Sequence, residues 1–155
     1  YRANERTLQI LTQVAGRAGR SPLGGQVILQ TFQPEHYVIR AASGHDLKAF
    51  YEQELAYRRQ LGYPPFVRLA RLEYRNLNPE KAERAALDLA SQIQGWMKED
   101  DRRLTRMIGP APSFFSHQNG YARWQIVLCG PDPVGLLRGR SLGEWKVEID
   151  PPNLL

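Results

Sequence analysis

The sequence predicts two unlike parts in order, a fragment of an α/β domain followed by an α+β domain with a ferredoxin-like arrangement. Three observations predict this fold class. Residues 1–62 contain several helix patterns but only one strand pattern, which leaves that strand without a neighbour. Pro64 and Pro65 then stop any helix and favour a stiff extended link. Beyond them the patterns follow the order β-α-β-β-α-β, which is typical of a split βαβ arrangement.

In the first part, residues 5–20 are predicted to form a helix, because apolar side chains placed at 100° steps gather in one arc. An apolar run at 26–32 predicts the single strand. A short helix is expected over 34–42 and a longer one over 47–61, for which Asp46 is a suitable N-cap. The apolar arc of the first helix consists of Leu8, Leu11, Val14, Ala15 and Ala18.

In the second part, a strand is predicted over 67–75, and a long helix follows it. Asn78 suits the N-cap and Pro79 the first helical position, and the helix is expected to end near Glu99. The apolar side of this helix predicts its core residues. They are Ala82, Ala86, Leu89, Ile93, Trp96 and Met97.

Asn119-Gly120 predicts a tight hairpin of the type I′ class, followed by a strand over 121–129. The segment before the hairpin is interrupted by prolines. Its Phe114 and Phe115 are expected in the core, and stacking on a nucleic-acid base is the alternative. Residues 134–139 allow only a stub of a second helix. A last strand is expected around 145–149, where apolar residues alternate with polar ones.

Composition narrows the class of protein. The 155 residues are 42% hydrophobic and 24% charged, which excludes global disorder. No apolar run reaches the roughly 18 residues of a membrane span, and the start lacks the apolar core of a signal peptide. The first residue is Tyr1 rather than Met, so we expect a fragment or a processed chain. Cys129 is the single cysteine, which excludes an internal disulfide and fits an intracellular location.

The positive net charge of the chain favours ligands that carry phosphate groups. The chain carries 21 Lys and Arg against 16 Asp and Glu, a net charge of +5, and 17 of the cations are Arg. The planar guanidinium group of arginine forms bidentate hydrogen bonds to phosphate oxygens and stacks on nucleic-acid bases. This bias favours nucleic acid as a partner, although codon bias and solvated helix faces would produce the same composition.

A polar constellation lies on the predicted first helix. Gln13, Arg17 and Arg20 recur at i, i+4 and i+7, so one amide and two guanidinium groups share a helical face. Arginines placed in this way can stabilise the charge that develops on a departing phosphoryl group. Gly16 and Gly19 carry no side chain, so another backbone can approach this face closely. The pattern favours polyphosphate binding over the alternative of an amphipathic helix with solvated arginines.

Residues 13–20 resemble motif VI of superfamily 2 helicases. Over essentially its whole length the chain resembles the C-terminal part of the PriA (primosomal protein N′) family of replication-restart helicases. The segments that carry this resemblance are 1–7, 11–20, 30–37, 50–55, 61–66, 109–112, 123–125 and 149–151. The resemblance implies three parts. Residues 1–45 would be the end of a RecA-like helicase lobe 2 and would contain motif VI. Residues 46–66 would form a helical connection, and residues 67–155 an α+β domain that binds DNA and partner proteins.

The resemblance implies an ATP-dependent 3′-to-5′ DNA helicase that takes part in primosome assembly at stalled forks. Arg20 and Arg17 would be catalytic, and Gln13, Gly16, Arg17 and Arg20 would bind ATP. Lobe 1, upstream, would complete the site and hold Mg²⁺, and the family's zinc-binding cysteines would also lie upstream, so this segment would bind no metal. The expected partners are replication forks, single-stranded DNA, single-stranded DNA-binding protein and helicase-loading proteins, with no membrane. The expected location is the bacterial cytoplasm, at the nucleoid.

The chain lacks a Gly-x-x-x-x-Gly-Lys-[Ser/Thr] P-loop and an Asp-Glu-x-His motif, so the isolated 155 residues should not hydrolyse ATP. The second helix of the α+β domain, within 133–140, is shorter than is usual in the family. The alternative function is a non-catalytic module that binds single-stranded nucleic acid, because ferredoxin-like sheets often do so.

Two arginines of the second part are candidate DNA contacts. Arg123 and Arg71 are predicted to lie on the polar side of the sheet, where Arg123 should be exposed and Tyr74 or Tyr121 could stack on bases. The alternative is edge-strand charge that prevents aggregation. The three tryptophans are expected in the core and the three histidines in structural or surface positions. Cys129 is expected to be a small buried residue.

Overall fold

In a computed structural model the chain is described over residues 1–18 and 25–152. It divides into two compact units, Tyr1–Leu61 and Gly62–Leu155, which we call unit 1 and unit 2. Within the described range, no helix is long and apolar enough to span a membrane.

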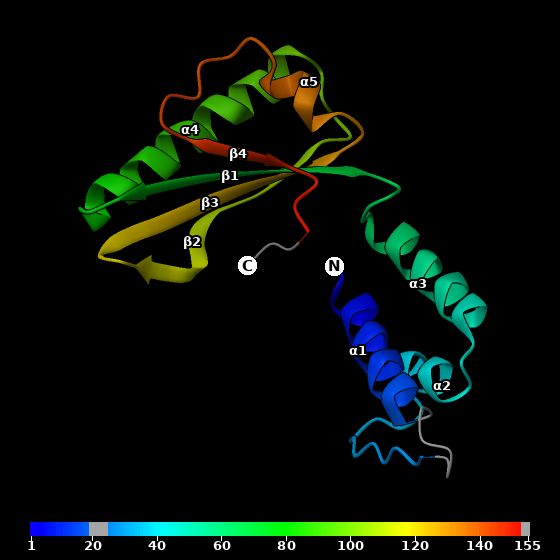
Figure 1. Cartoon of the computed structure of the whole chain (residues 1–155). Coiled ribbons are helices and arrows are strands. Elements are labelled where there is room, and N and C mark those ends of the chain that lie inside the picture. Colours follow the sequence, from blue (N-terminus) through cyan, green and yellow to red (C-terminus); the bar gives the residue numbers. More distant parts are fainter. Residues whose placement is uncertain (19–24, 153–155) are drawn as a thin grey trace. The chain divides into compact units, whose positions relative to one another are not determined.

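The described residues of unit 1 form three helices, α1 (Ala3–Ala18), α2 (Tyr37–Ser43) and α3 (Leu47–Leu61) (Figure 1). Side-chain caps account for two of their starts, one of which, at Asp46, the sequence predicts. The His36 side chain accepts a hydrogen bond from the backbone N–H of Val38, and the Asp46 carboxylate accepts one from Ala49 at 2.9 Å. The predicted cap at Asp46 is thereby confirmed, whereas α2 begins later than the sequence pattern indicates.

The apolar core of unit 1 is small. It consists of one buried side chain from α1, two from α2 and one from α3. Tyr37 stacks on Phe50 and on Tyr57, with ring centroids 5.8 and 5.7 Å apart. The buried members are Leu8, Val38, Ala41 and Phe50.

The strand predicted over 26–32 is absent. These residues form no ladder in the structure, and their apolar side chains are exposed, including Ile28 and Phe32. The apolar run is real, but a strand also requires backbone partners from a neighbouring strand. The four strands of the described chain all belong to unit 2 and pair among themselves.

Unit 2 is a four-stranded sheet with two helices (Figure 1). Its elements in chain order are β1 (Arg68–Asn76), α4 (Pro79–Glu99), β2 (Arg106–Gln118), β3 (Tyr121–Gly130), α5 (Pro133–Leu137) and β4 (Lys146–Ile149). The strands lie in the order β2-β3-β1-β4, and all three pairings are antiparallel. Both helices lie on one side of the sheet. This arrangement is compatible with the predicted ferredoxin-like domain.

The core of unit 2 lies between α4, α5 and the sheet. Asn78 caps α4 by accepting a hydrogen bond from the Lys81 N–H, as the sequence predicts. Alternate residues of β1 and β3 then face the apolar side of α4, since successive strand residues point to opposite faces. The buried core consists of Ala70, Leu72, Leu89, Ala90, Ile93, Ile126, Leu128, Leu136 and Leu137.

The predicted hairpin joins β2 to β3. Gln118 pairs with Tyr121, which leaves Asn119 and Gly120 as the two-residue loop. Both loop residues have positive φ, 53° and 82°, as a type I′ turn requires. The hairpin prediction is therefore confirmed.

Candidate functional site

The exposed side of α1 carries the motif that the sequence singled out. Gln9, Gln13 and Arg17 are all exposed, and we call these three residues the α1 polar face. Gly16 is exposed beside them, and a Cβ built on it would meet nothing within 4 Å. Arg20, with Gly19, lies outside the described residues. The structure thus brings Gln13, Gly16 and Arg17 onto one open surface.

The α1 polar face is available to an anionic ligand. Among the described residues, Arg17 lies within ion-pair distance of no carboxylate, in contrast to Arg2, just before the same helix, which pairs with Glu5 at 2.9 Å. An unpaired guanidinium and a neighbouring amide are donors that suit phosphate oxygens. This donor set therefore fits the phosphate end of a nucleotide.

A buried polar cluster, which the sequence did not predict, holds α1 against α2 and α3. Glu54 is only 2% exposed and accepts hydrogen bonds from the Tyr37 hydroxyl at 2.5 Å and from Arg58 at 2.8 Å. Asn4 of α1 donates to Glu54 at 3.2 Å, and Arg58 forms an ion pair with Glu5 at 3.0 Å. We call Asn4, Glu5, Tyr37, Glu54 and Arg58 the buried polar cluster. The only sequence signal for it was the i,i+4 spacing of Glu54 and Arg58.

Burial and hydrogen bonding shift the pKa values of Glu54 and Tyr37 in this cluster. Burial by itself would raise the pKa of Glu54, but hydrogen bonds from Tyr37, Arg58 and Asn4 outweigh it and lower that pKa. Burial and the Glu54 carboxylate both raise the pKa of the Tyr37 hydroxyl. Glu54 is therefore a carboxylate and Tyr37 a neutral donor at neutral pH, which keeps the cluster in one hydrogen-bonded arrangement.

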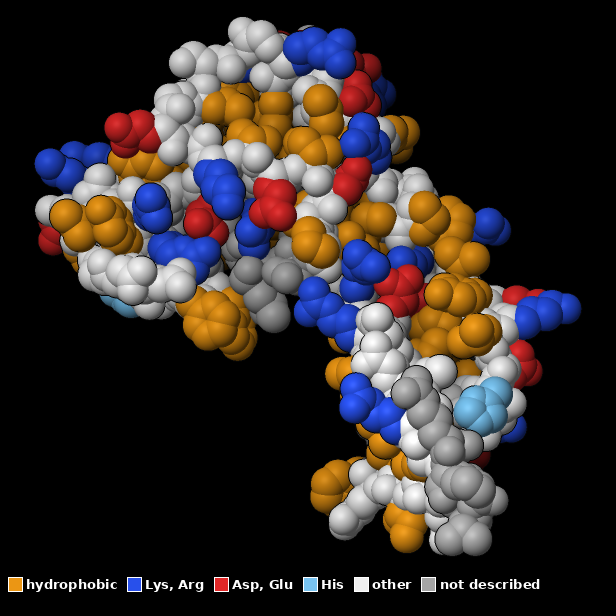
Figure 2. Space-filling model, in the orientation of Figure 1, with side chains coloured by type: hydrophobic (Ala, Val, Ile, Leu, Met, Phe, Trp, Pro, Cys, Tyr) orange, Lys and Arg blue, Asp and Glu red, His pale blue; other side chains and the backbone are white. Residues whose placement is uncertain are grey.

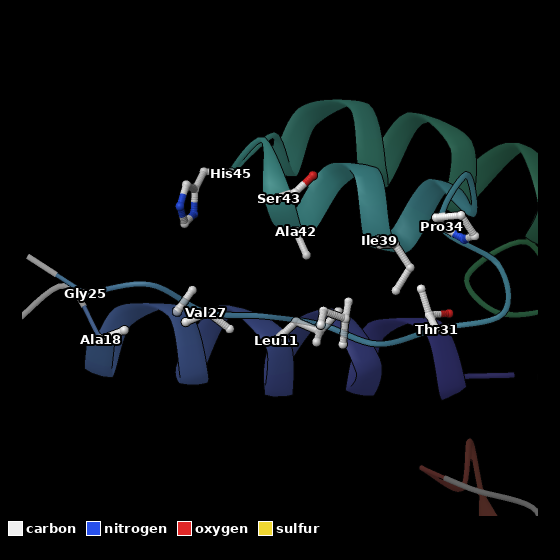
Figure 3. A pocket seen from close by; sticks show the side chains of 12 residues that line it. Leu11, Ala18, Gly25, Val27, Thr31, Pro34, Ile39, Ala42, Ser43 and His45 are labelled. Carbon is white, nitrogen blue, oxygen red and sulfur yellow. The ribbon is translucent and has the colours of Figure 1, made fainter.

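An apolar groove of about 570 Å³ opens between α1, α2 and the extended segment that follows residue 25. In Figure 3 the side chains of Leu11, Val27 and Ile39 extend into this groove from its three sides. At one end, a Cβ built on Gly25 would lie 2.1 Å from the carbonyl oxygen of Ala18. Only glycine permits this close approach. Part of the predicted apolar arc of α1 thus lines an open groove instead of a closed core.

The two predicted DNA contacts of unit 2 are held by carboxylates. Arg123, expected to be exposed, is only 16% exposed and pairs with Glu73 at 2.6 Å. Arg71 is 12% exposed and pairs with Glu148 at 2.7 Å. The exposure expected for Arg123 is wrong, because β1 places Glu73 beside its guanidinium. Figure 2 shows the resulting mixture of basic and acidic side chains on the visible face of unit 2.

Phe114 and Phe115 were expected in the core, and this is wrong. They are 68% and 59% exposed, and their rings meet edge to face with centroids 5.0 Å apart. The register between β2 and β3 shifts at this point, and the two side chains lie in the part of β2 that has extra residues. By contrast, Trp96 and Trp145 pack against the core of unit 2.

The remaining candidates have structural roles. Cys129 is buried, and its thiol lies 3.4 Å from the carbonyl oxygen of Gly62, as expected for a small buried residue. His36 caps α2. Asp100 caps α4 and pairs with Arg140 at 2.9 Å. In the part of the chain that the structure describes, no group of three or more His, Cys, Asp or Glu side chains is placed to hold a metal ion.

A four-stranded antiparallel sheet with its helices on one side, joined to a helical unit with an open arginine-bearing face, defines an α+β domain of a multidomain protein. Residues 59–152 match the protein family described as the primosomal protein N C-terminal domain. Because the match covers more than half of the chain, the chain belongs to this family.

Its relatives carry one name. The chain is 38% identical over its whole length to the replication restart protein PriA of Bacillus subtilis (strain 168), of which it covers 19%. It is 37% identical over its whole length to the protein of the same name from Treponema pallidum (strain Nichols), covering 24%, and 31% identical over 99% of its length to that of Thermotoga maritima, covering 20%. The chain thus spans about a fifth of the length of these relatives.

Proposed function

We propose that the chain is the C-terminal segment of an ATP-dependent 3′-to-5′ DNA helicase of replication restart. Relatives named replication restart protein PriA match the chain from end to end, which supports this assignment. The observation that carries the enzymatic part is the α1 polar face, where an exposed arginine without a carboxylate partner in the described chain lies beside an exposed amide.

Unit 1 would complete an ATP site whose phosphate-binding loop and Mg²⁺ ligands lie outside this chain. Gln13 and Arg17 would donate to the terminal phosphate oxygens, and Arg20 would act as the arginine finger. Gly16 would allow the facing backbone to come close. Bound ATP would supply the free energy for strand separation. The buried polar cluster would fix α1 so that these donors stay aimed outward.

The apolar groove supports the proposal that unit 1 is the end of a RecA-like lobe 2. The apolar segment 26–32 has strand character in sequence but no partner strand among the described residues. We propose that upstream parts of the same protein supply that partner strand and cover the groove. Burying this much apolar surface would stabilise unit 1 substantially, at roughly 25 cal/mol per Å².

Unit 2 would bind DNA at the fork and partner proteins, including single-stranded DNA-binding protein and helicase loaders. The role of Arg71 and Arg123 as DNA contacts stays a prediction, and a phosphate would have to compete there with Glu148 and Glu73. Any zinc site would lie upstream. With chromosomal DNA as its substrate, the protein would act in the cytoplasm at the nucleoid.

The decisive experiment measures ATP hydrolysis by the intact gene product with and without forked DNA. Wild-type activity should rise with DNA, and Arg20→Ala should lower kcat by about 10³-fold or more, the range for an arginine finger. Arg17→Ala should lower it as well. Arg40→Ala, which removes an exposed arginine of α2, is the control and should keep the wild-type rate.

Two outcomes would contradict this function. Equal losses in Arg20→Ala and Arg40→Ala would show that charge rather than position matters. DNA binding without any ATPase in the wild type would favour the alternative, a non-catalytic module for single-stranded nucleic acid, in which the α1 arginines only grip DNA.

A further inference from the structure

A bulge in β2 places two aromatic rings in solvent. Between the pairs Pro112↔Trp124 and His117↔Ala122, β2 has four intervening residues where β3 has only Arg123. A strand with extra residues bends away from its partner, and bulges often re-aim side chains at functional sites. Here the extra residues include Phe114 and Phe115.

The two rings form an exposed platform. Neighbouring strand residues normally point to opposite faces, yet Phe114 and Phe115 contact each other edge to face at 5.0 Å and remain 68% and 59% exposed. Two large apolar side chains exposed side by side indicate a binding surface more strongly than a single one.

Arg123 holds the bulge in this shape. Its guanidinium donates to the backbone carbonyl of Phe115 at 3.4 Å and to the Gln118 side chain at 2.8 Å. The Nη2 atom of the same guanidinium forms an ion pair with the Glu73 carboxylate of β1 at 2.6 Å. The residue opposite the bulge therefore ties the aromatic segment to the hairpin and to the centre of the sheet.

A cation is available at the same end of the sheet. Arg75 is the register partner of Arg123, it is exposed, and its guanidinium lies 5.2 Å from the ring centre of Tyr121. Among the described residues it lies within ion-pair distance of no carboxylate. In Figure 2, hydrophobic side chains lie beside Lys and Arg side chains at the hairpin end of unit 2.

We propose that Phe114 and Phe115, together with Arg75 at the same end of the sheet, form a base-stacking site for single-stranded DNA. Aromatic rings interleaved with cations are the usual way to bind single strands, because every base has a π-face and every linkage a negative charge. A purely apolar protein partner would not need Arg75, which has no carboxylate partner among the described residues. This inference rests on the proposed function, in which unit 2 binds DNA, and it assigns the residues that do so.

The test compares two probes on the full 155-residue chain, a labelled oligothymidylate and an abasic oligonucleotide of equal length. The abasic strand keeps the phosphates but has no bases to stack. Wild type should bind the oligothymidylate more tightly. The double variant Phe114→Ala/Phe115→Ala should lose at least about five-fold in that affinity, since stacking on one ring typically contributes that much or more. Its affinity for the abasic strand should not change.

Two further variants separate loss of base stacking from other causes of weaker DNA binding. Leu104→Ala removes another exposed apolar side chain of unit 2 and should bind both probes as wild type does. Arg75→Gln should weaken both probes alike and reduce the salt dependence by about 0.7 in slope, the effect of one phosphate contact on a single strand. Circular dichroism of each variant checks that the fold is retained.

Unchanged oligothymidylate binding in the double variant would overturn the stacking site while leaving DNA binding by the chain intact, and would point to a protein partner for the platform. Equal wild-type affinity for the two probes would overturn it as well. If wild type bound neither probe, the DNA-binding role proposed for unit 2 would fail together with the site, whereas the ATPase test of Arg20 would stand separately.

Discussion

Unit 1 and unit 2 are stabilised in different ways. Unit 2 encloses an apolar core in which nine buried residues from both helices and the central strands pack together. Unit 1 has four such residues, and its helices are joined in addition by the buried polar cluster around Glu54. Unit 1 also leaves Ile28 and Phe32 exposed and a groove of about 570 Å³ open.

This difference concerns the kind of interaction that holds each unit together. Apolar burial is non-directional and tolerates many arrangements, so a closed core such as that of unit 2 can stand alone. A buried ionic cluster stabilises little net, because desolvation offsets most of the Coulomb attraction, but it specifies one geometry. Unit 1 therefore combines a defined orientation of α1 with modest stability.

The largest effect is expected from breaking the buried polar cluster. Glu54→Leu leaves Arg58 and Tyr37 buried without their main acceptor, and removal of one member of a buried ion pair typically costs about 3–5 kcal/mol. Hydrogen exchange should show the loss in the amides of α1, α2 and α3, with the sheet of unit 2 still protected. Glu52→Leu, on the exposed side of α3, is the control and should change little. If Glu54→Leu and Glu52→Leu lost equal amide protection, the buried polar cluster would not be what stabilises unit 1, which would contradict the difference described between the units.

The next effect is a cavity in unit 2. Ile126 is fully buried between the sheet and α4, and Ile126→Ala should lower the free energy of unfolding by about 2–5 kcal/mol. Denaturant unfolding followed by circular dichroism measures this loss. Leu104→Ala, at an exposed site, should stay within about 0.5 kcal/mol of wild type. A loss confined to unit 1 amides in Ile126→Ala would refute the assignment of this core to unit 2.

The smallest effect is a dependence on pH. Because the folded state lowers the pKa of Glu54 below its ordinary value of 4.5, the carboxylate stabilises unit 1 fully above that value. This contribution is lost as the pH falls through the lowered pKa. Unfolding measured from neutral to acid pH should show unit 1 losing stability, and Glu54→Leu should remove this part of the acid dependence. An unchanged acid profile in that variant would assign the dependence to other carboxylates.

Local chemistry was predictable from the sequence. The caps at Asp46 and Asn78 and the Asn119-Gly120 turn each depend on a few adjacent residues, and all three occur in the structure. The α1 polar face was predictable for the same reason, since helical periodicity alone sets which side chains lie together. The order of strands and helices in unit 2 followed from these local signals.

Other features depend on partners far away in the sequence. The run at 26–32 has the composition of a strand, but no strand of the described chain pairs with it. Arg123 was expected to be exposed, and the cross-strand position of Glu73 decided otherwise. Glu54 and Arg58 have the i,i+4 spacing of a helical ion pair, but only the packing of α1 and α2 over them makes them the centre of a buried cluster.

The sequence by itself determined the helices, the hairpin, the basic charge and the motif along α1, because hydrogen bonds and periodicity within a few residues decide these. Only the tertiary structure decided which charged side chains form ion pairs, which aromatic rings are exposed to solvent and which predicted strand pairs with another strand. The physical reason is that side-chain burial and cross-strand contacts depend on register. A bulge of a few residues in β2 was enough to move Phe114 and Phe115 from the expected core to the surface.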